Sequence, residues 1–187
     1  MLKFIGNIIQ LIFSPQRGWE DLEADDRYAL GNRDVRRLYV GCFLPFILLC
    51  SLTSFVRMFY GLDFLGALQQ SIIEFFALFL SYHVAVYLFS LTMKRILGPD
   101  REPDQRRYAT MIIYCISAVS LIFLLGNVIK VTLALIQLLP FYVIFIIWKA
   151  APYVGVPQRS IGLYMLMASA SILGSVYGLS FLFHVLV

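Results

Sequence analysis

Lys94–Arg107, KRILGPDREPDQRR, is the one long polar interruption in the C-terminal two thirds of the chain. The segments on both sides of it are uncharged runs that are too long for a soluble core and long enough to cross the hydrocarbon of a bilayer. The stretch contains five basic residues, and basic loops are retained on the cytoplasmic side of a membrane. It is therefore predicted to be a cytoplasmic loop that fixes how every other apolar segment crosses.

The composition indicates an integral membrane protein. Of 187 residues, 60% are hydrophobic and only 14% are charged, and the mean hydropathy is +0.82. A soluble domain of this size needs more charge on its surface. The net charge of +4 does not indicate nucleic-acid binding, because the basic residues stand at the ends of apolar runs. Cys42, Cys50 and Cys115 fall inside these runs without the spacing of metal ligands.

Five apolar runs predict an all-α membrane protein, a bundle of five transmembrane helices. The predicted spans are 38–56, 65–93, 108–129, 131–148 and 161–187. Pro45 is expected to disturb the first span, and the short gap around Lys130 predicts that the third and fourth form an antiparallel hairpin.

The basic residues predict the orientation of the bundle. The N-terminal segment has six Lys and Arg residues, the 94–107 loop five and the 149–160 loop two. The opposite side has only Arg57 and Lys130. The distribution places the N-terminus in the cytoplasm and the C-terminus outside.

Residues 1–37 are predicted to form a cytoplasmic segment at the membrane surface, preceding a transmembrane domain over 38–187. Met1–Phe13 places its polar side chains on one helical face, which is typical of an amphipathic interfacial helix. Ser14 and Pro15 predict the start of a second helix, and Trp19 is expected at the level of the lipid headgroups. Glu20–Asp34 is expected to be a solvated charged linker. A signal peptide and a calcium loop are the alternatives for these stretches, and neither pattern is complete.

Glu74 is the candidate functional residue within a span, because an ionisable group in the hydrocarbon is costly. Gln70, Glu74 and Ser81 lie on one helical face and form a candidate polar site. One interpretation is a carboxyl group that locks two helices together. The other is a proton or ion relay. His83 should point away from Glu74, and both His83 and His184 are expected to be structural.

Ala170, Gly174 and Gly178 form a small-residue face in the last span, where another helix can approach closely. This face could pack the bundle internally or join the chain to a second copy or another membrane protein. We find no HExxH, GxSxG or nucleotide-binding loop. We therefore expect no enzyme activity, no catalytic or metal-binding residues, no cofactor, and neither nucleotide nor nucleic acid as a partner.

The order of these features resembles the bacterial branch of the YIP-domain family. The similarity rests on SPQRGWEDL at 14–22, RRYATMIIYCISA at 106–118 and LLPFYVIFIIWKAAPYVGVP at 138–157. Pro15 and Trp19 match the proline–tryptophan element of that family, and Tyr114 matches its tyrosine in the third span. The family is named for membrane proteins that interact with Ypt/Rab GTPases. The Asp-Leu-Tyr-Gly-Pro element of its eukaryotic members is missing from this chain.

The resemblance implies a multi-pass protein of a bacterial inner membrane. We expect a non-enzymatic scaffold or organiser of membrane proteins or lipids, whose partners are the bilayer and other membrane proteins or a second copy. The alternative is a small transporter or channel subunit that uses Glu74, which predicts a water-accessible cavity lined by Gln70 and Glu74.

Overall fold

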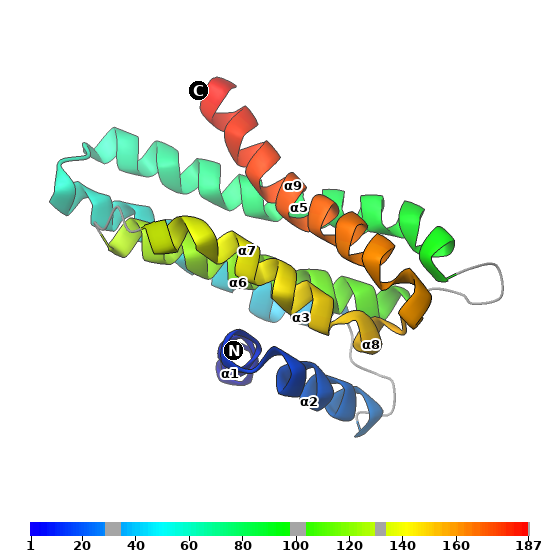
Figure 1. The fold of residues 1–187 in the computed structure, drawn as a ribbon. Helices are drawn as coiled ribbons and strands as arrows, with labels where there is room; N and C mark the ends of the chain where they lie inside the picture. The colour runs from blue at the N-terminus through cyan, green and yellow to red at the C-terminus, as the bar shows by residue number, and fades with distance from the viewer. Residues whose placement is uncertain (29–34, 98–103, 130–133, 187) are drawn as a thin grey trace.

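The computed structural model describes residues 1–28, 35–97, 104–129 and 134–186. Over these residues the chain forms helices and no strands (Figure 1). Four helical segments are long and apolar enough to cross a membrane: Val35–Tyr60, Phe64–Met93, Gln105–Val128 and Gln158–Leu186. The all-α class is confirmed, with four candidate membrane spans by length and composition, and the predicted fifth span is not confirmed.

The elements follow in order along the chain. They are α1 (Leu2–Phe13), α2 (Pro15–Tyr28), α3 (Val35–Leu38), the π-helical η1 (Tyr39–Phe43), α4 (Leu44–Leu52), the 3-10 helix η2 (Thr53–Tyr60), α5 (Phe64–Leu97), α6 (Gln105–Val128), α7 (Ala134–Lys149), α8 (Ala151–Val154), the 3-10 helix η3 (Gln158–Ser160) and α9 (Ile161–Leu186). The predicted 94–107 loop is bounded by α5 and α6, and its residues 98–103 lie outside the described part of the chain.

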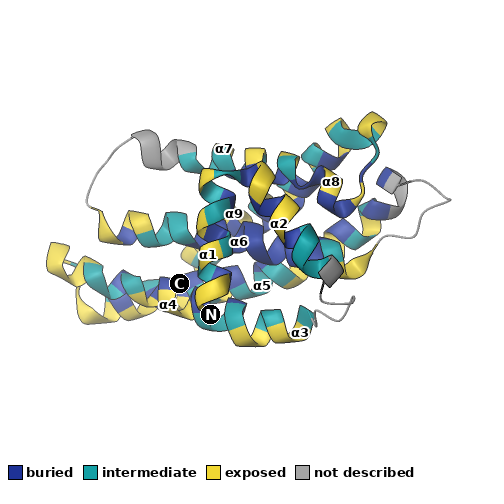
Figure 2. Ribbon diagram, turned by 90° about the horizontal axis from the view of Figure 1, so that it is seen from below, coloured by how far each residue is buried: buried dark blue, intermediate teal, exposed yellow. Residues whose placement is uncertain are grey.

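Helix α6 is the centre of the bundle. Every residue from Tyr108 to Ser120 is buried, so α6 is covered on all sides over this stretch (Figure 2). The other long helices are apolar on their outer surfaces as well: Phe64, Tyr87 and Phe181 are more than half exposed. An apolar outer surface around a packed core is the arrangement that lipid requires.

The first span changes its helical type at Pro45, as the sequence leads us to expect. Proline cannot donate a backbone hydrogen bond and crowds the carbonyl one turn before it. The turn before Pro45 widens into the π-helix η1, where the Leu44 N–H donates to the Tyr39 carbonyl. The last part of the span, η2, tightens into a 3-10 helix and places Ser54 and Arg57 beside α5 and α6.

Helices α6 and α7 form the predicted antiparallel hairpin. The Tyr164 hydroxyl lies 3.0 Å from both the Met111 sulfur, early in α6, and the Ile147 carbonyl, late in α7. The predicted fourth span is only partly matched, because α7 begins at Ala134 and has 16 residues. Residues 130–133, including Lys130, lie outside the described part of the chain.

The N-terminal helices pack against the bundle, with α1 crossing the direction of the long helices (Figure 1). Phe4, Ile8 and Leu11 are buried in the same core as α4 and α6, whereas Leu2, Ile9 and Phe13 are exposed. Protein therefore covers one part of the apolar surface of α1 and leaves the other part open. The close approach of α1 and α2 requires Gly18, since a Cβ there would lie 3.1 Å from the Leu11 Cα.

Two predictions for α2 are wrong. The stretch from Glu20 to Tyr28 is helical rather than a linker, because its acidic side chains have partners on α1 and the bundle, such as the Lys3–Asp25 pair at 2.8 Å. Trp19 is 2% exposed, so protein side chains surround it and it is not an exposed residue of an aromatic belt. Its indole N–H donates to the Ile146 carbonyl at 3.0 Å.

Candidate functional site

Glu74 lies inside the bundle and accepts hydrogen bonds on both carboxylate oxygens. It stands ten residues after the start of α5, about 15 Å along the helix, and is 6% exposed. Gln70 donates to Oε1 at 2.9 Å and Ser54 donates to Oε2 at 3.0 Å. The Asn127 amide donates to both oxygens, at 3.2 and 2.9 Å.

These donors come from three consecutive parts of the fold. Ser54 lies in η2, Gln70 is one turn before Glu74 on α5, and Asn127 lies in the last turn of α6. Every contact to the carboxylate is a neutral donor, and an ionised carboxylate is a group that only accepts. The arrangement can therefore solvate a negative charge without water.

His184 extends this network to the last helix. Its Nε2 lies 3.1 Å from the Gln70 side-chain oxygen, and its Nδ1 lies 2.8 Å from the Ser180 carbonyl. Both ring nitrogens therefore contact acceptor oxygens. Gln70 links α9 to the carboxylate on α5, because its amide oxygen contacts His184 and its amide nitrogen donates to Glu74.

An open cavity of about 530 Å³ reaches this network. Its polar and charged wall consists of Arg57, Gln70, Glu74, Ser180 and His184, and Ile122, Phe123, Pro140 and Tyr177 are among its other lining residues. A neighbouring pocket of about 370 Å³ also touches Arg57 and contains Asn127 on its wall. One carboxylate, two basic side chains and several apolar side chains therefore line the same cavity, between the helices that are long enough to span a membrane.

The candidate polar site is only partly assembled as predicted. Gln70 and Glu74 meet, whereas Ser81 lies two turns further along α5, is fully buried, and donates to the Ala77 carbonyl of its own helix. The Ser81 carbonyl accepts from Ser175 at 3.3 Å, which places Ser81 in the contact between α5 and α9. Ser81 therefore belongs to helix packing and does not line the cavity.

The two histidines differ in their position relative to Glu74. His83 lies apart from Glu74, as predicted, and its Nε2 is 3.0 Å from the Tyr39 hydroxyl. His184 lies at the Glu74 site through its contact with Gln70, and its structural role stays a prediction. Sequence spacing could not show this link because 114 residues separate the two side chains.

Ala170, Gly174 and Gly178 face outward from α9. All three are exposed, and a Cβ built at Gly174 or Gly178 would meet no atom within 4 Å. Within the described residues, the internal packing of α9 uses Ala168, Ser171 and Ser175 instead, all of which are buried. The small-residue face is therefore free of any helix of its own chain among those described.

The three residues that carry the family resemblance lie on α2 and α6: Pro15 and Trp19 belong to α2, and Tyr114 belongs to α6. Pro15 and Trp19 are buried, and the Trp19 ring lies 6.4 Å from the Tyr114 ring, edge to face. Tyr114 accepts a hydrogen bond from Asn7 at 3.1 Å. Trp19 and Tyr114 therefore join α2 to α6, and none of the three residues lines the Glu74 cavity.

Arg107 and Tyr153 fasten the end of α2. Tyr153 donates to Asp26 at 2.7 Å, and Arg107 lies 3.7 Å from Glu23 and donates to the Tyr153 carbonyl at 3.0 Å. Burial raises the pKa of Tyr153, and the neighbouring Asp26 carboxylate raises it further, so its hydroxyl remains a donor.

The described residues contain no cluster of three or more His, Cys, Asp or Glu side chains that could hold a metal ion. The Glu74 carboxylate is surrounded by hydrogen-bond donors, and a carboxyl group can take up or release a proton. Neither a protein-family model, nor a curated protein, nor a solved structure matches this chain.

Proposed function

We propose that this protein is a non-enzymatic, multi-pass membrane protein that acts as a small transporter or channel subunit, in which Glu74 takes up and releases a proton or small cation. The observation that supports this proposal is the open cavity whose wall includes both Gln70 and Glu74. An ionisable residue that lines a cavity within the spans is typical of an ion or proton pathway.

The proposal includes the five-span topology, with the N-terminus in the cytoplasm and α7 as the fourth span. Its support is the antiparallel packing of α6 and α7 and the Trp148–Lys149 pair at the end of α7. In this topology the cavity opens on the outer side, because α5 begins and α9 ends there. A bacterial inner membrane is the setting that the YIP-domain resemblance implies.

Proton flux into liposomes tests the role of Glu74. With the full-length protein reconstituted and a pH gradient imposed, we expect Glu74→Gln to lower the initial flux at least about tenfold, since the glutamine cannot exchange a proton. A pH-sensitive dye inside the liposomes gives the rate, and the same assay with Na⁺ or K⁺ gradients measures cation flux.

His83→Gln is the matched control, because it removes a titratable group from the same helix outside the cavity. It should leave the flux at the wild-type level. Flux that survives in Glu74→Gln, or an absence of proton and cation flux in the wild type, would contradict the proposal.

The outward face of α9 favours a second candidate, a scaffold that joins membrane proteins. Ala170, Gly174 and Gly178 present a surface that another helix can approach closely, and the described chain leaves it uncovered. The partner is a second copy or another membrane protein, and the two functions are compatible because this face does not line the cavity.

We expect Gly174→Leu to abolish a crosslinked or native-mass complex of the gently extracted protein, because the leucine prevents close approach of the partner backbone. Gly41→Leu is the control, since Gly41 is an exposed glycine with equally open surroundings in another span. Native mass spectrometry should show the complex in the wild type and in Gly41→Leu. A complex that persists in Gly174→Leu would remove this face from consideration.

A further inference from the structure

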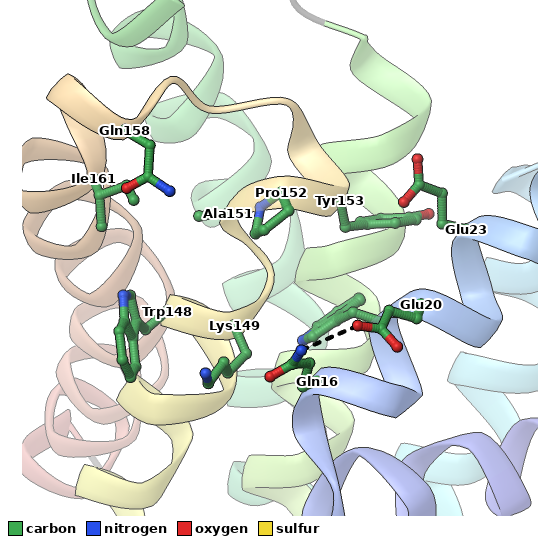
Figure 3. A pocket seen from close by; sticks show the side chains of 11 residues that line it. Gln16, Glu20, Glu23, Trp148, Lys149, Ala151, Pro152, Tyr153, Gln158 and Ile161 are labelled. Atoms are coloured by element: carbon green, nitrogen blue, oxygen red, sulfur yellow. Dashed lines mark hydrogen bonds between the residues drawn. The ribbon is translucent and has the colours of Figure 1, made fainter.

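A second pocket, of about 280 Å³, lies between α2, the end of α7, α8 and the start of α9 (Figure 3). Helix α2 contributes Glu20 and Glu23 on one side, and α7 contributes Trp148 and Lys149 on the other. The pocket shares no lining residue with the Glu74 cavity. It lies at the opposite end of the bundle, where α7 ends and α9 begins (Figure 1).

The pocket holds opposite charges that do not neutralise each other. The Lys149 ammonium lies 4.5 Å from the centre of the Trp148 ring and has no salt-bridge partner among the described residues. Glu20 accepts a hydrogen bond from Gln16 at 3.1 Å and likewise forms no salt bridge in the described part of the chain. Figure 3 shows both side chains at the pocket, on different helices.

The residues that line the pocket are of the kinds found in the headgroup region of a membrane. Trp148 and Lys149 end the apolar run of α7, and aromatic and basic residues at such helix ends lie at the membrane–water interface. Ile161, at the start of the last span, lines the same pocket. A ligand here would have its polar part among these charges and its apolar part beside the helices.

We propose that this pocket binds the headgroup of a phospholipid that carries a primary ammonium group beside its phosphate, as phosphatidylethanolamine does. Lys149 pairs with the phosphate, and Glu20 accepts hydrogen bonds from the ammonium. The volume of about 280 Å³ suits a headgroup, while the acyl chains remain in the bilayer.

The same charges predict which lipids are disfavoured. The choline headgroup has no N–H with which to donate to Glu20. An anionic headgroup without an ammonium group, such as phosphoglycerol, pairs with Lys149 but offers no cation to the Glu20 carboxylate. The expected order of affinity places the ethanolamine lipid first.

Tryptophan fluorescence reads this pocket directly, because both tryptophans of the chain, Trp19 and Trp148, line it. The full-length protein in detergent is titrated with short-chain phosphatidylethanolamine, with the matching phosphatidylcholine, and with soluble glycerophosphoethanolamine. We expect saturable binding of the ethanolamine lipid with an affinity about fivefold above that of the choline lipid, the range of one partly exposed ion pair. The soluble compound should bind more weakly than the lipid.

Glu20→Gln should reduce the preference for the ethanolamine lipid to nearly none, whereas Lys149→Gln should weaken the binding of both lipids, because both carry the phosphate. Arg159→Gln is the matched control, because it removes an exposed positive charge at the same end of the bundle outside the pocket. The proposal would be overturned by equal affinities for the two lipids in the wild type, by a preference that survives Glu20→Gln, or by unchanged lipid binding in Lys149→Gln. If glycerophosphoethanolamine binds as tightly as the lipid, the claim that the ligand is a membrane lipid would be wrong.

Discussion

Trp19→Ala is expected to lower the free energy of unfolding by about 3–5 kcal/mol, the usual cost of removing a large buried aromatic side chain. The indole is 2% exposed and packs between Tyr114 and Tyr153, with ring centres 6.4 and 5.2 Å away. Its loss leaves a cavity where α2 meets α6, α7 and α8. The segment from α1 to α2 should therefore detach from the bundle at lower temperature.

Trp19→Phe separates packing from hydrogen bonding. The phenyl ring retains part of the bulk but cannot donate to the Ile146 carbonyl. That carbonyl still accepts from the Ala150 N–H at 3.2 Å, so we expect the lost hydrogen bond itself to cost only about 1 kcal/mol. The total loss should fall well below that of the alanine variant.

Thermal unfolding in mild detergent, followed by circular dichroism, measures both changes. Trp148→Ala is the control, since Trp148 is 39% exposed and its removal should lower the melting temperature far less. Equal melting temperatures for Trp19→Ala and Trp148→Ala would show that α2 does not depend on this anchor.

Hydrophobic periodicity and run length predicted the helices of the bundle because a lipid-facing helix must be apolar over its whole length. The start of α2 at Pro15, the irregular turn at Pro45 and the hairpin of α6 and α7 follow from local chemistry in the same way. The position of Trp19 did not follow from local chemistry, because a tryptophan near a helix end is equally suited to the membrane interface and to a buried anchor. Which of these two positions Trp19 takes depends on the elements that pack against α2.

Only two residues of the site, Glu74 and Gln70, were predictable from the sequence. The cost of a carboxyl group in the hydrocarbon identified Glu74, and the spacing of one turn added Gln70. Ser54, Asn127, Arg57 and His184 could not be found from spacing, since each lies on another element. Asn127 offered a weak signal, as a polar amide near the end of an apolar span. Ser81 was wrongly assigned to the polar site, because a serine hydroxyl can donate to a carbonyl within its own helix.

Asn127→Leu is expected to lower the free energy of unfolding by about 3 kcal/mol, because it removes the donor shared by both oxygens of a buried carboxylate. In a Glu74→Gln background the same substitution should cost about 1–2 kcal/mol less, since a neutral amide needs less solvation by its neighbours. The interaction free energy of this double-mutant cycle, from unfolding in detergent, measures how strongly Asn127 solvates the charge of Glu74. Ser117→Ala is the control, because its buried hydroxyl donates to the Ile113 carbonyl of its own helix. Additive effects of Asn127→Leu and Glu74→Gln would mean that the carboxylate is neutral in the folded protein, which would also remove the charged site on which cation binding depends.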